Sequence, residues 1–319
     1  MRIDPAIAAL RRDRAPQRRA QAVTAAACDA WRAAPEVRAM LAEFHCYAAG
    51  APLASCPSLL ALFADQDSAP ALTTALTRAL CAALAAEPFG HPPFRHGYDR
   101  GTATLLLARD GRAQLLLHAS EPGTRAFDTV AFSDAERHEA VLGGEAKARV
   151  VRRQGQFGRL AAQALVLEPG VRLALDLREQ ALQLLAVERT LVSLRLHRTA
   201  GNPEPSREYD LATGALLRQA AGDIRASRHE AMFALLGRMQ RTEAVPVMAA
   251  IAREPGDASL RWQALRECLA LDTAAGIATL GELARAEEDP LASPARTLLA
   301  QLRETHHELH TLEPLSCHA

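Results

Sequence analysis

The sequence has almost no lysine, few aromatic residues and no excess of charge of either sign. Of its 37 basic residues only Lys147 is a lysine, and 37 acidic residues bring the formal net charge to zero. A neutral chain has no global field that would attract nucleic acid or an anionic membrane. Aromatic residues make up 4% of the chain, which leaves few side chains for stacking on bases. We therefore expect neither a nucleic-acid nor a membrane function.

Several motifs of known chemistry are also missing. The six cysteines include no CxxC pair, and the chain has no GxSxG, Walker or dinucleotide-binding motif. No apolar run approaches the 18 residues of a membrane span, and none of signal-peptide length follows the N-terminus. We expect reduced thiols and a soluble, cytoplasmic protein. The bias toward Arg and Ala is typical of a GC-rich genome, which suggests a bacterial source.

Hydrophobic periodicity divides the chain into three regions, which predicts a multidomain α+β protein. Residues 1–86 carry Ala, Leu and Arg at helical spacing, interrupted by Pro and Ser. Within this region Leu72, Leu76, Leu80 and Leu84 recur every four residues. This apolar stripe is expected to pack on the next region.

Residues 87–220 change to short apolar runs separated by turns. TATLLLAR and RAQLLLHAS are joined by Asp110-Gly111, a pair that favours a tight hairpin. Further short runs follow, among them HEAVL and AKARVVR, separated by a predicted turn at Gly143-Gly144, and ALQLLAV and TLVSLRLHR, predicted as two more strands. ATG at 212–214 suggests a last hairpin. Many short strands with such turns predict an antiparallel β-sandwich or jelly roll.

Residues 221–319 return to a helical period that repeats itself and then end in a polar tail. Ala231, Ala264 and Ala295 stand in register, 33 and 31 residues apart, within HEAMFALLGRM, WQALRECLAL and PARTLLAQL. VPVMAAIAR and IATLGELAR align at an offset of 32. The pattern resembles HEAT-type helical hairpins, which stack because one hairpin cannot bury its apolar face alone.

The strand rhythm of residues 88–200 resembles the cupin jelly roll. The resemblance rests on RHEAVLGGEAKARVVRRQG and on the LxPG turn at 167–170. Metal-binding cupins carry a HxH pair followed by a Glu, with a further His in a second motif. Here Glu139 and then Ala140 follow His138, so the second His of the pair is absent, and Asp176 is the only candidate in the second motif.

The segment HPPFRHGYD at residues 91–99 holds the densest group of metal-binding residue types. Two His and one Asp would match the facial triad of non-haem iron oxygenases, with further His arriving from strands. The alternative is a polar loop, stiffened by Pro92 and Pro93, that leads into the sheet. The candidate ligands of Fe, Mn or Zn are His91, His96, Asp99, His118, His138, Glu139 and His197.

Two terminal segments are weaker candidates. In the tail, His306 and His310 are four residues apart, with Cys317 and His318 nearby, but a frayed polar tail explains this pattern as well. The Arg-rich stretch at 11–19 is better explained by a solvated helix face than by binding to phosphates.

Three functional hypotheses follow from these patterns. The first is a binding or accessory protein, whose helical repeats dock a protein partner while the β domain packs with them or binds a small ligand. The second is a metal-dependent cupin-type enzyme that uses the candidate His residues with Asp99 or Glu139. The third is a sensor, in which the β domain binds an organic ligand and the repeats relay the change.

Overall fold

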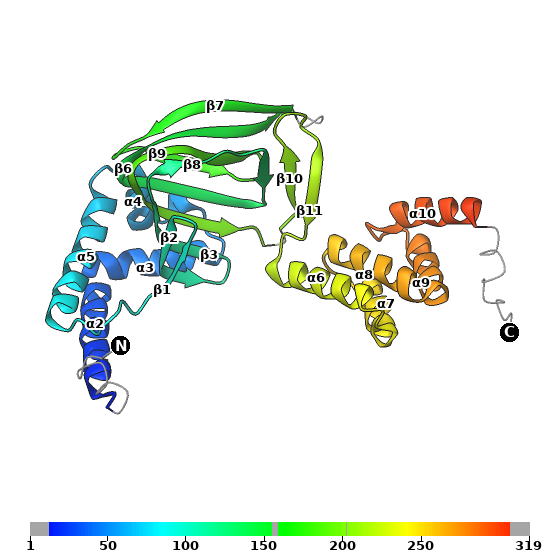
Figure 1. Cartoon of the computed structure of the whole chain (residues 1–319), viewed down its shortest axis with the longest axis horizontal. Helices are drawn as coiled ribbons and strands as arrows, with labels where there is room; N and C mark the ends of the chain where they lie inside the picture. The colour runs from blue at the N-terminus through cyan, green and yellow to red at the C-terminus, as the bar shows by residue number, and fades with distance from the viewer. Residues whose placement is uncertain (1–12, 155–158, 202, 307–319) are drawn as a thin grey trace, which may run out of the picture. The chain divides into compact units, whose positions relative to one another are not determined.

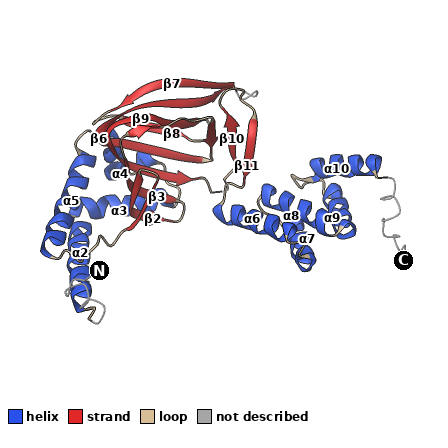
Figure 2. Cartoon of the chain, viewed as in Figure 1, coloured by secondary structure: helices blue, strands red, loops and turns tan. Residues whose placement is uncertain are grey.

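The computed structural model describes residues 13–154, 159–201 and 203–306, and it confirms the α+β class (Figure 1). Helices at the N-terminus precede antiparallel β-sheets, and further helices follow them (Figure 2). The chain forms two compact units: the first comprises Met1–Gly201 with Tyr209–Ala215, and the second Asn202–Glu208 with Leu216–Ala319. The N-terminal helices and the large sheet thus belong to one unit.

The helices of the first unit begin at residues that suit helix starts. Pro35 and Pro57 occupy first helical positions, where the fixed φ of proline fits and its missing N–H costs no hydrogen bond. The elements are α2 (Ala15–Ala33), α3 (Pro35–Ala48), the short 3-10 helix η1 (Leu53–Ser55), α4 (Pro57–Ala64) and α5 (Ser68–Ala86).

These helices cover one face of the large sheet. Leu76 on α5 is fully buried in the same apolar cluster as Leu115 and Leu194 of the sheet. Leu72 and Leu80 belong to this cluster too, so three of the four leucines of the stripe join the core shared with the strands, while the half-buried Leu84 does not. By length and composition alone α5 would also be long and apolar enough to cross a membrane, a criterion that core helices of globular proteins meet as well.

The large sheet is antiparallel, in the order β1-β2-β3-β9-β6-β7, with β4 paired to β9 and β8 paired to β6. The predicted hairpin is confirmed, because β2 and β3 pair across a turn in which Gly111 has φ +46°. The strands are β1 (Arg95–Asp99), β2 (Thr102–Asp110), β3 (Ala113–Ser120), β4 (Gly123–Thr124), β6 (Ala135–Gln154), β7 (Arg159–Leu167), β8 (Arg172–Asp176) and β9 (Gln180–Thr199).

The strands β6 and β9 are each 20 residues long, whereas the sequence pattern predicted two short strands in each place. Gly143 and Gly144, interpreted as a turn, lie inside β6, where its register against β9 shifts. Gly144 has φ +88°, and a Cβ there would overlap the carbonyl of Thr190. The glycines therefore permit a bend within a continuous strand, and apolar residues before and after the bend share one cluster, among them Val141 and Ala148.

A smaller sheet has the order β11-β10-β5. Its strands are β5 (Thr129–Phe132), β10 (Ser206–Asp210) and β11 (Leu216–Ala220), and the last two form the hairpin predicted from ATG, with Gly214 at φ +72°.

The second unit contains five α-helices within its described residues: α6 (Ile224–Arg238), α7 (Val245–Arg253), α8 (Ala258–Leu271), α9 (Thr273–Arg285) and α10 (Ala292–Thr305). Helix α8 packs against α6, α7 and α9, and α10 packs against α9. Arg261, 3% exposed, donates Nε to the Ala252 carbonyl (3.0 Å) and Nη2 to Asp289 (2.5 Å), which ties three segments together. Ala264 and Ala295 are fully buried, as expected for close helix contacts, whereas Ala231, the third alanine of the alignment, is exposed. The assignment to HEAT repeats stays a prediction.

Candidate functional site

Alternation along the central strands gives the large sheet two chemically different faces. Successive side chains of a strand point to opposite sides. On β6, His138 lies opposite Leu196 of β9 and faces the helices, while its neighbour Glu139 lies opposite Arg195 and faces the other side. We call the second side the inner face. Its polar residues include Gln114, His118 and Ser120 on β3, Arg137 and Glu139 on β6, and Ser193, Arg195 and His197 on β9.

Glu139 lies at the centre of the inner face and has no exposed surface. Its Oε1 accepts a hydrogen bond from Ser193 Oγ (2.7 Å) and lies 2.8 Å from Arg195 Nε. Its Oε2 lies 3.7 Å from Arg137 Nε. Both guanidinium groups are largely buried, with 14% of the Arg195 side chain and 18% of the Arg137 side chain exposed.

The charges of this cluster do not balance. Among the described residues, Glu139 is the only carboxylate within ion-pair distance of Arg137 or Arg195, so one positive charge is left over. Burial raises the pKa of Glu139, but the charges of Arg195 and Arg137 and the hydrogen bond from Ser193 outweigh it, and the pKa lies below its ordinary 4.5. Glu139 is therefore ionised at neutral pH, and the excess charge persists.

Unsatisfied polar atoms concentrate on the same face. Within the described part of the chain, seven buried side-chain N or O atoms have no hydrogen-bond partner, and five of them lie on the inner face. Burial, with help from the charge of Arg195, lowers the pKa of His118 to about 4, so its imidazole is neutral at pH 7. The five atoms are His118 Nδ1, Ser120 Oγ, Arg137 Nε, Glu139 Oε2 and Arg195 Nε, of which the last forms the 2.8 Å ion pair with Glu139 Oε1.

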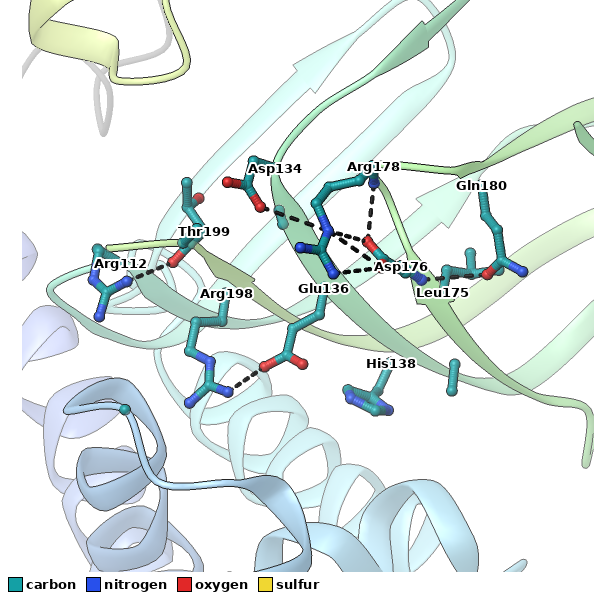
Figure 3. Close-up of a pocket in the computed structure, with 14 residues that line it drawn as sticks. Arg112, Asp134, Glu136, His138, Leu175, Asp176, Arg178, Gln180, Arg198 and Thr199 are labelled. Carbon is teal, nitrogen blue, oxygen red and sulfur yellow. Dashed lines mark hydrogen bonds and ion pairs between the residues drawn. The ribbon is translucent and has the colours of Figure 1, made fainter. Parts of the chain in front are cut away.

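A second polar feature, a cleft of about 610 Å³, opens on the helix side of the sheet (Figure 3). At its wall Arg198 donates Nη1 to the carbonyls of Tyr47 (2.6 Å) and Ala51 (2.7 Å), and its Nη2 lies 2.5 Å from Glu136. His138 also lines the cleft, and burial lowers the pKa of its imidazole. Arg198 thus clamps the end of α3 to the sheet, and its hydrogen-bond donors are occupied by these contacts within the protein.

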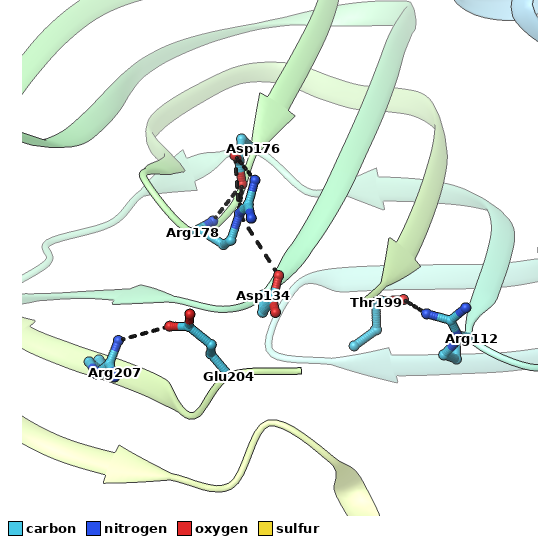
Figure 4. A network of polar contacts seen from close by, with 7 residues as sticks. All are labelled: Arg112, Asp134, Asp176, Arg178, Thr199, Glu204 and Arg207. Atoms are coloured by element: carbon cyan, nitrogen blue, oxygen red, sulfur yellow. Dashed lines mark hydrogen bonds and ion pairs between the residues drawn. The ribbon is translucent and has the colours of Figure 1, made fainter. Parts of the chain in front are cut away.

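The rim of the cleft is charge-balanced. Arg178 Nη2 lies 2.7 Å from Asp176 Oδ2, and its Nε lies 3.8 Å from Asp134 (Figure 4). Arg112 donates to the Thr199 carbonyl at 3.0 Å. Since the arginines at the rim already have partners, the cleft gives a weaker indication of a bound ligand than the inner face does.

The segment HPPFRHGYD contributes to neither feature. Its second half forms the edge strand β1, which pairs with β2, so it is not a loop throughout. The side chains of His91, His96 and Asp99 are exposed. His96 Nδ1 lies 3.1 Å from the carbonyl oxygen of Phe94.

The seven candidate ligands do not fit one metal ion. In the ranges that the structure describes, no three His, Cys, Asp or Glu residues gather in a way that could hold a metal. His138 and Glu139 point to opposite faces, and the guanidinium groups beside Glu139 would repel a divalent cation. In the tail, His306 is described and exposed, while His310, Cys317 and His318 lie outside the described residues. Metal binding by any subset stays a prediction.

Sequence reasoning identified His118, Glu139 and His197 but missed the two arginines that determine the charge of the inner face. The missed signal was alternation in SLRLH at 193–197, where polar residues occupy every second position; RHE at 137–139 is polar throughout and carries no such signal. Arg137 and Arg195 do not stand out in the sequence, because Arg is the common cation throughout this chain.

Comparisons with known proteins give limited likenesses. No family model and no curated protein matches the chain. Among solved structures, the 7S globulin of Momordica charantia is 14% identical over 37% of this chain and 35% of its own, with a TM-score of 0.27. A cupin superfamily protein of Desulfitobacterium hafniense is 14% identical over 33% and 83%, with a TM-score of 0.24. The cupin domain of Drosophila melanogaster CENP-C is 13% identical over 32% and 74%, with a TM-score of 0.27. This chain thus spans about a third of the globulin's length.

Proposed function

We propose that the protein is a binding protein whose first unit holds a small hydroxycarboxylate on the inner face of the large sheet. The observation that carries the proposal is the concentration of unpartnered buried polar atoms around Arg137, Glu139 and Arg195. Buried polar groups in folded proteins are nearly always paired, by the protein, by water or by a ligand. Water would satisfy hydrogen bonds but would not neutralise the excess positive charge, which a bound anion does.

The hydrogen-bonding types select the ligand. Arg137 Nε makes no hydrogen bond and is a donor suited to a carboxylate, whereas Arg195 Nε already lies 2.8 Å from Glu139 Oε1. The free oxygen of Glu139 is an acceptor, and it needs a donor such as a hydroxyl group. A carboxylate with a hydroxyl on the adjacent carbon presents both groups within the span of a few atoms.

A matched set of ligands tests this proposal. We expect lactate to raise the melting temperature of the protein more than propionate, which lacks the hydroxyl, and lactamide, which lacks the charge, to have no effect. A measurement with inorganic phosphate distinguishes a site that recognises carboxylates from one that binds anions in general. All samples would contain equal ionic strength, since salt alone changes electrostatic stability.

Two variants locate the site. Arg137→Gln should abolish the response to lactate, because it removes the donor and the excess charge. Arg152→Gln, on the same strand but exposed, should leave it unchanged. An equal response of both variants to lactate would refute binding on the inner face.

We also propose that the second unit docks a protein partner in the cytoplasm. What supports this is a groove of about 710 Å³ between helices α8, α9 and α10, lined mainly by apolar side chains. Concave faces of stacked helices are common docking surfaces. A β unit that binds a ligand and a helical unit that binds a protein would suit an accessory or sensor role.

A further inference from the structure

We infer that the partner of the second unit presents an amphipathic helix with acidic residues beside its apolar stripe. The inference rests on the proposed docking role and specifies the chemistry of its partner. It is argued from the groove between α8, α9 and α10, all of whose lining residues are described.

The groove has the form that receives a helix. Trp262, Arg266 and Leu269 project from one side of α8, at spacings of four and three residues. Leu298 and Leu302 project from α10, four residues apart. Such spacing forms parallel ridges, and a helix binds between them through side chains at i, i+3 or i+4, and i+7. Thr273 and Ile277 of α9 complete the floor.

Its side chains suit a hot spot of binding. Trp262 is half-buried, so part of its indole remains available for contact. Tryptophan and arginine are the residue types that most often dominate binding energy at protein interfaces. Leu298 and Leu302 are also half-buried. Together with Trp262 they give the groove an accessible apolar surface.

Charge complementarity determines which sign of charge the partner's helix should carry. None of the eight lining residues is acidic, and the two with ionisable side chains are Arg266 and His306. Arg266 is exposed, and within the described residues no carboxylate lies within ion-pair distance of it. A guanidinium without a partner at the edge of an apolar groove favours Glu or Asp on an incoming helix, and disfavours Lys or Arg.

The test uses the full chain and two labelled peptides of about 20 residues, a length that allows helix formation in isolation. Both carry Leu at helical i, i+3 and i+7 positions; one has Glu beside the stripe, and the other has Lys. By fluorescence anisotropy we expect the Glu peptide to bind roughly tenfold more tightly than the Lys peptide at low salt. Emission from Trp262 in a Trp31→Phe background should shift on binding, because these are the two tryptophans of the chain.

Charge reversal provides the decisive variant. Arg266→Glu should remove or invert the preference for the Glu peptide, whereas Arg285→Glu, exposed on α9 outside the groove, should not. Equal or tighter binding of the Lys peptide would overturn the acidic partner and leave docking intact. Failure of both peptides to bind, with residues 307–319 present and with them removed, would overturn docking itself.

Two other occupants would also overturn the inference. If the Glu peptide binds only after residues 307–319 are removed, the chain's own tail occupies the groove. If sedimentation shows a dimer that Arg266→Glu dissociates, the occupant is a second copy.

Discussion

His138 and Glu139 are neighbours on β6, yet their side chains lie on opposite faces of the sheet. His138 lines the cleft beneath the helices, and Glu139 is buried between Arg195 and Ser193 on the inner face. The two residues therefore have different electrostatic surroundings and should respond differently to the same kind of substitution.

Glu139→Gln should lower the free energy of unfolding by about 3–5 kcal/mol, because it leaves two buried guanidinium groups without a counter-charge. His138→Gln should cost less than about 1 kcal/mol, since this half-buried imidazole contacts the ring of Phe63 and has no ion-pair partner among the described residues. Urea unfolding at neutral pH measures both. Similar losses in the two variants would contradict the assignment of the two faces.

Stability should decrease as the pH falls from about 6.5 to about 4. The pKa of His118 is 6.5 in the unfolded chain and about 4 in the fold, so the unfolded state takes up the proton first. The loss should reach roughly 3 kcal/mol across this interval from His118 alone. His138 and His197, whose pKa values burial also lowers, act in the same direction.

The variant His118→Gln should flatten this dependence, as measured by urea unfolding at about pH 7 and about pH 5. His96→Gln is the control, since His96 is exposed on the edge strand. If the free energy of unfolding of His118→Gln depends on pH as that of the unchanged protein does, the imidazole is already protonated in the folded state.

Arg198→Lys should lower the free energy of unfolding by about 2 kcal/mol. Lysine cannot reproduce the two hydrogen bonds to the carbonyls of Tyr47 and Ala51, nor the stacking of the guanidinium 3.9 Å above the Tyr47 ring. Arg189→Lys, at an exposed pair with Glu145, should change stability by less than about 0.5 kcal/mol. Thermal or urea unfolding measures the difference, and equal effects would argue against the clamp.

Gly144→Ala should cost at least about 3 kcal/mol, because the φ of +88° disfavours a side chain and the new methyl group would overlap the Thr190 carbonyl. The adjacent Gly143→Ala should cost about 1 kcal/mol or less, since a Cβ there meets no atom within 4 Å. Unfolding curves of the two variants test whether the bend in β6 depends on one glycine. If both tolerate alanine equally, the bend has another cause.

Purified protein should contain well under one equivalent of Fe, Mn or Zn per chain, because the positive charge of the inner face opposes cation binding. Mass spectrometry of protein prepared without chelator measures this. One equivalent of metal that is lost in His118→Gln would restore the metal-dependent enzyme hypothesis and count against the proposed anion site.

The sequence predicted those elements that depend only on residues close together in the chain. The Asp110-Gly111 hairpin and the leucine stripe of α5 follow from turn chemistry and from helical period, which neighbouring residues determine. The same reasoning failed at Gly143-Gly144, because glycine permits a turn and a bend alike. Only pairing with β9 distinguishes the two.

The candidate site likewise depends partly on local sequence and partly on strand pairing. The sequence alone supplied a neutral chain, an α+β order of elements and the polar residue types of the strands. It did not determine which histidines meet, since His96 and His118 are 22 residues apart and lie on different strands. The tertiary structure decided that Glu139 faces Arg195 and turns away from His138, because strand register fixes both the neighbours and the face of every side chain.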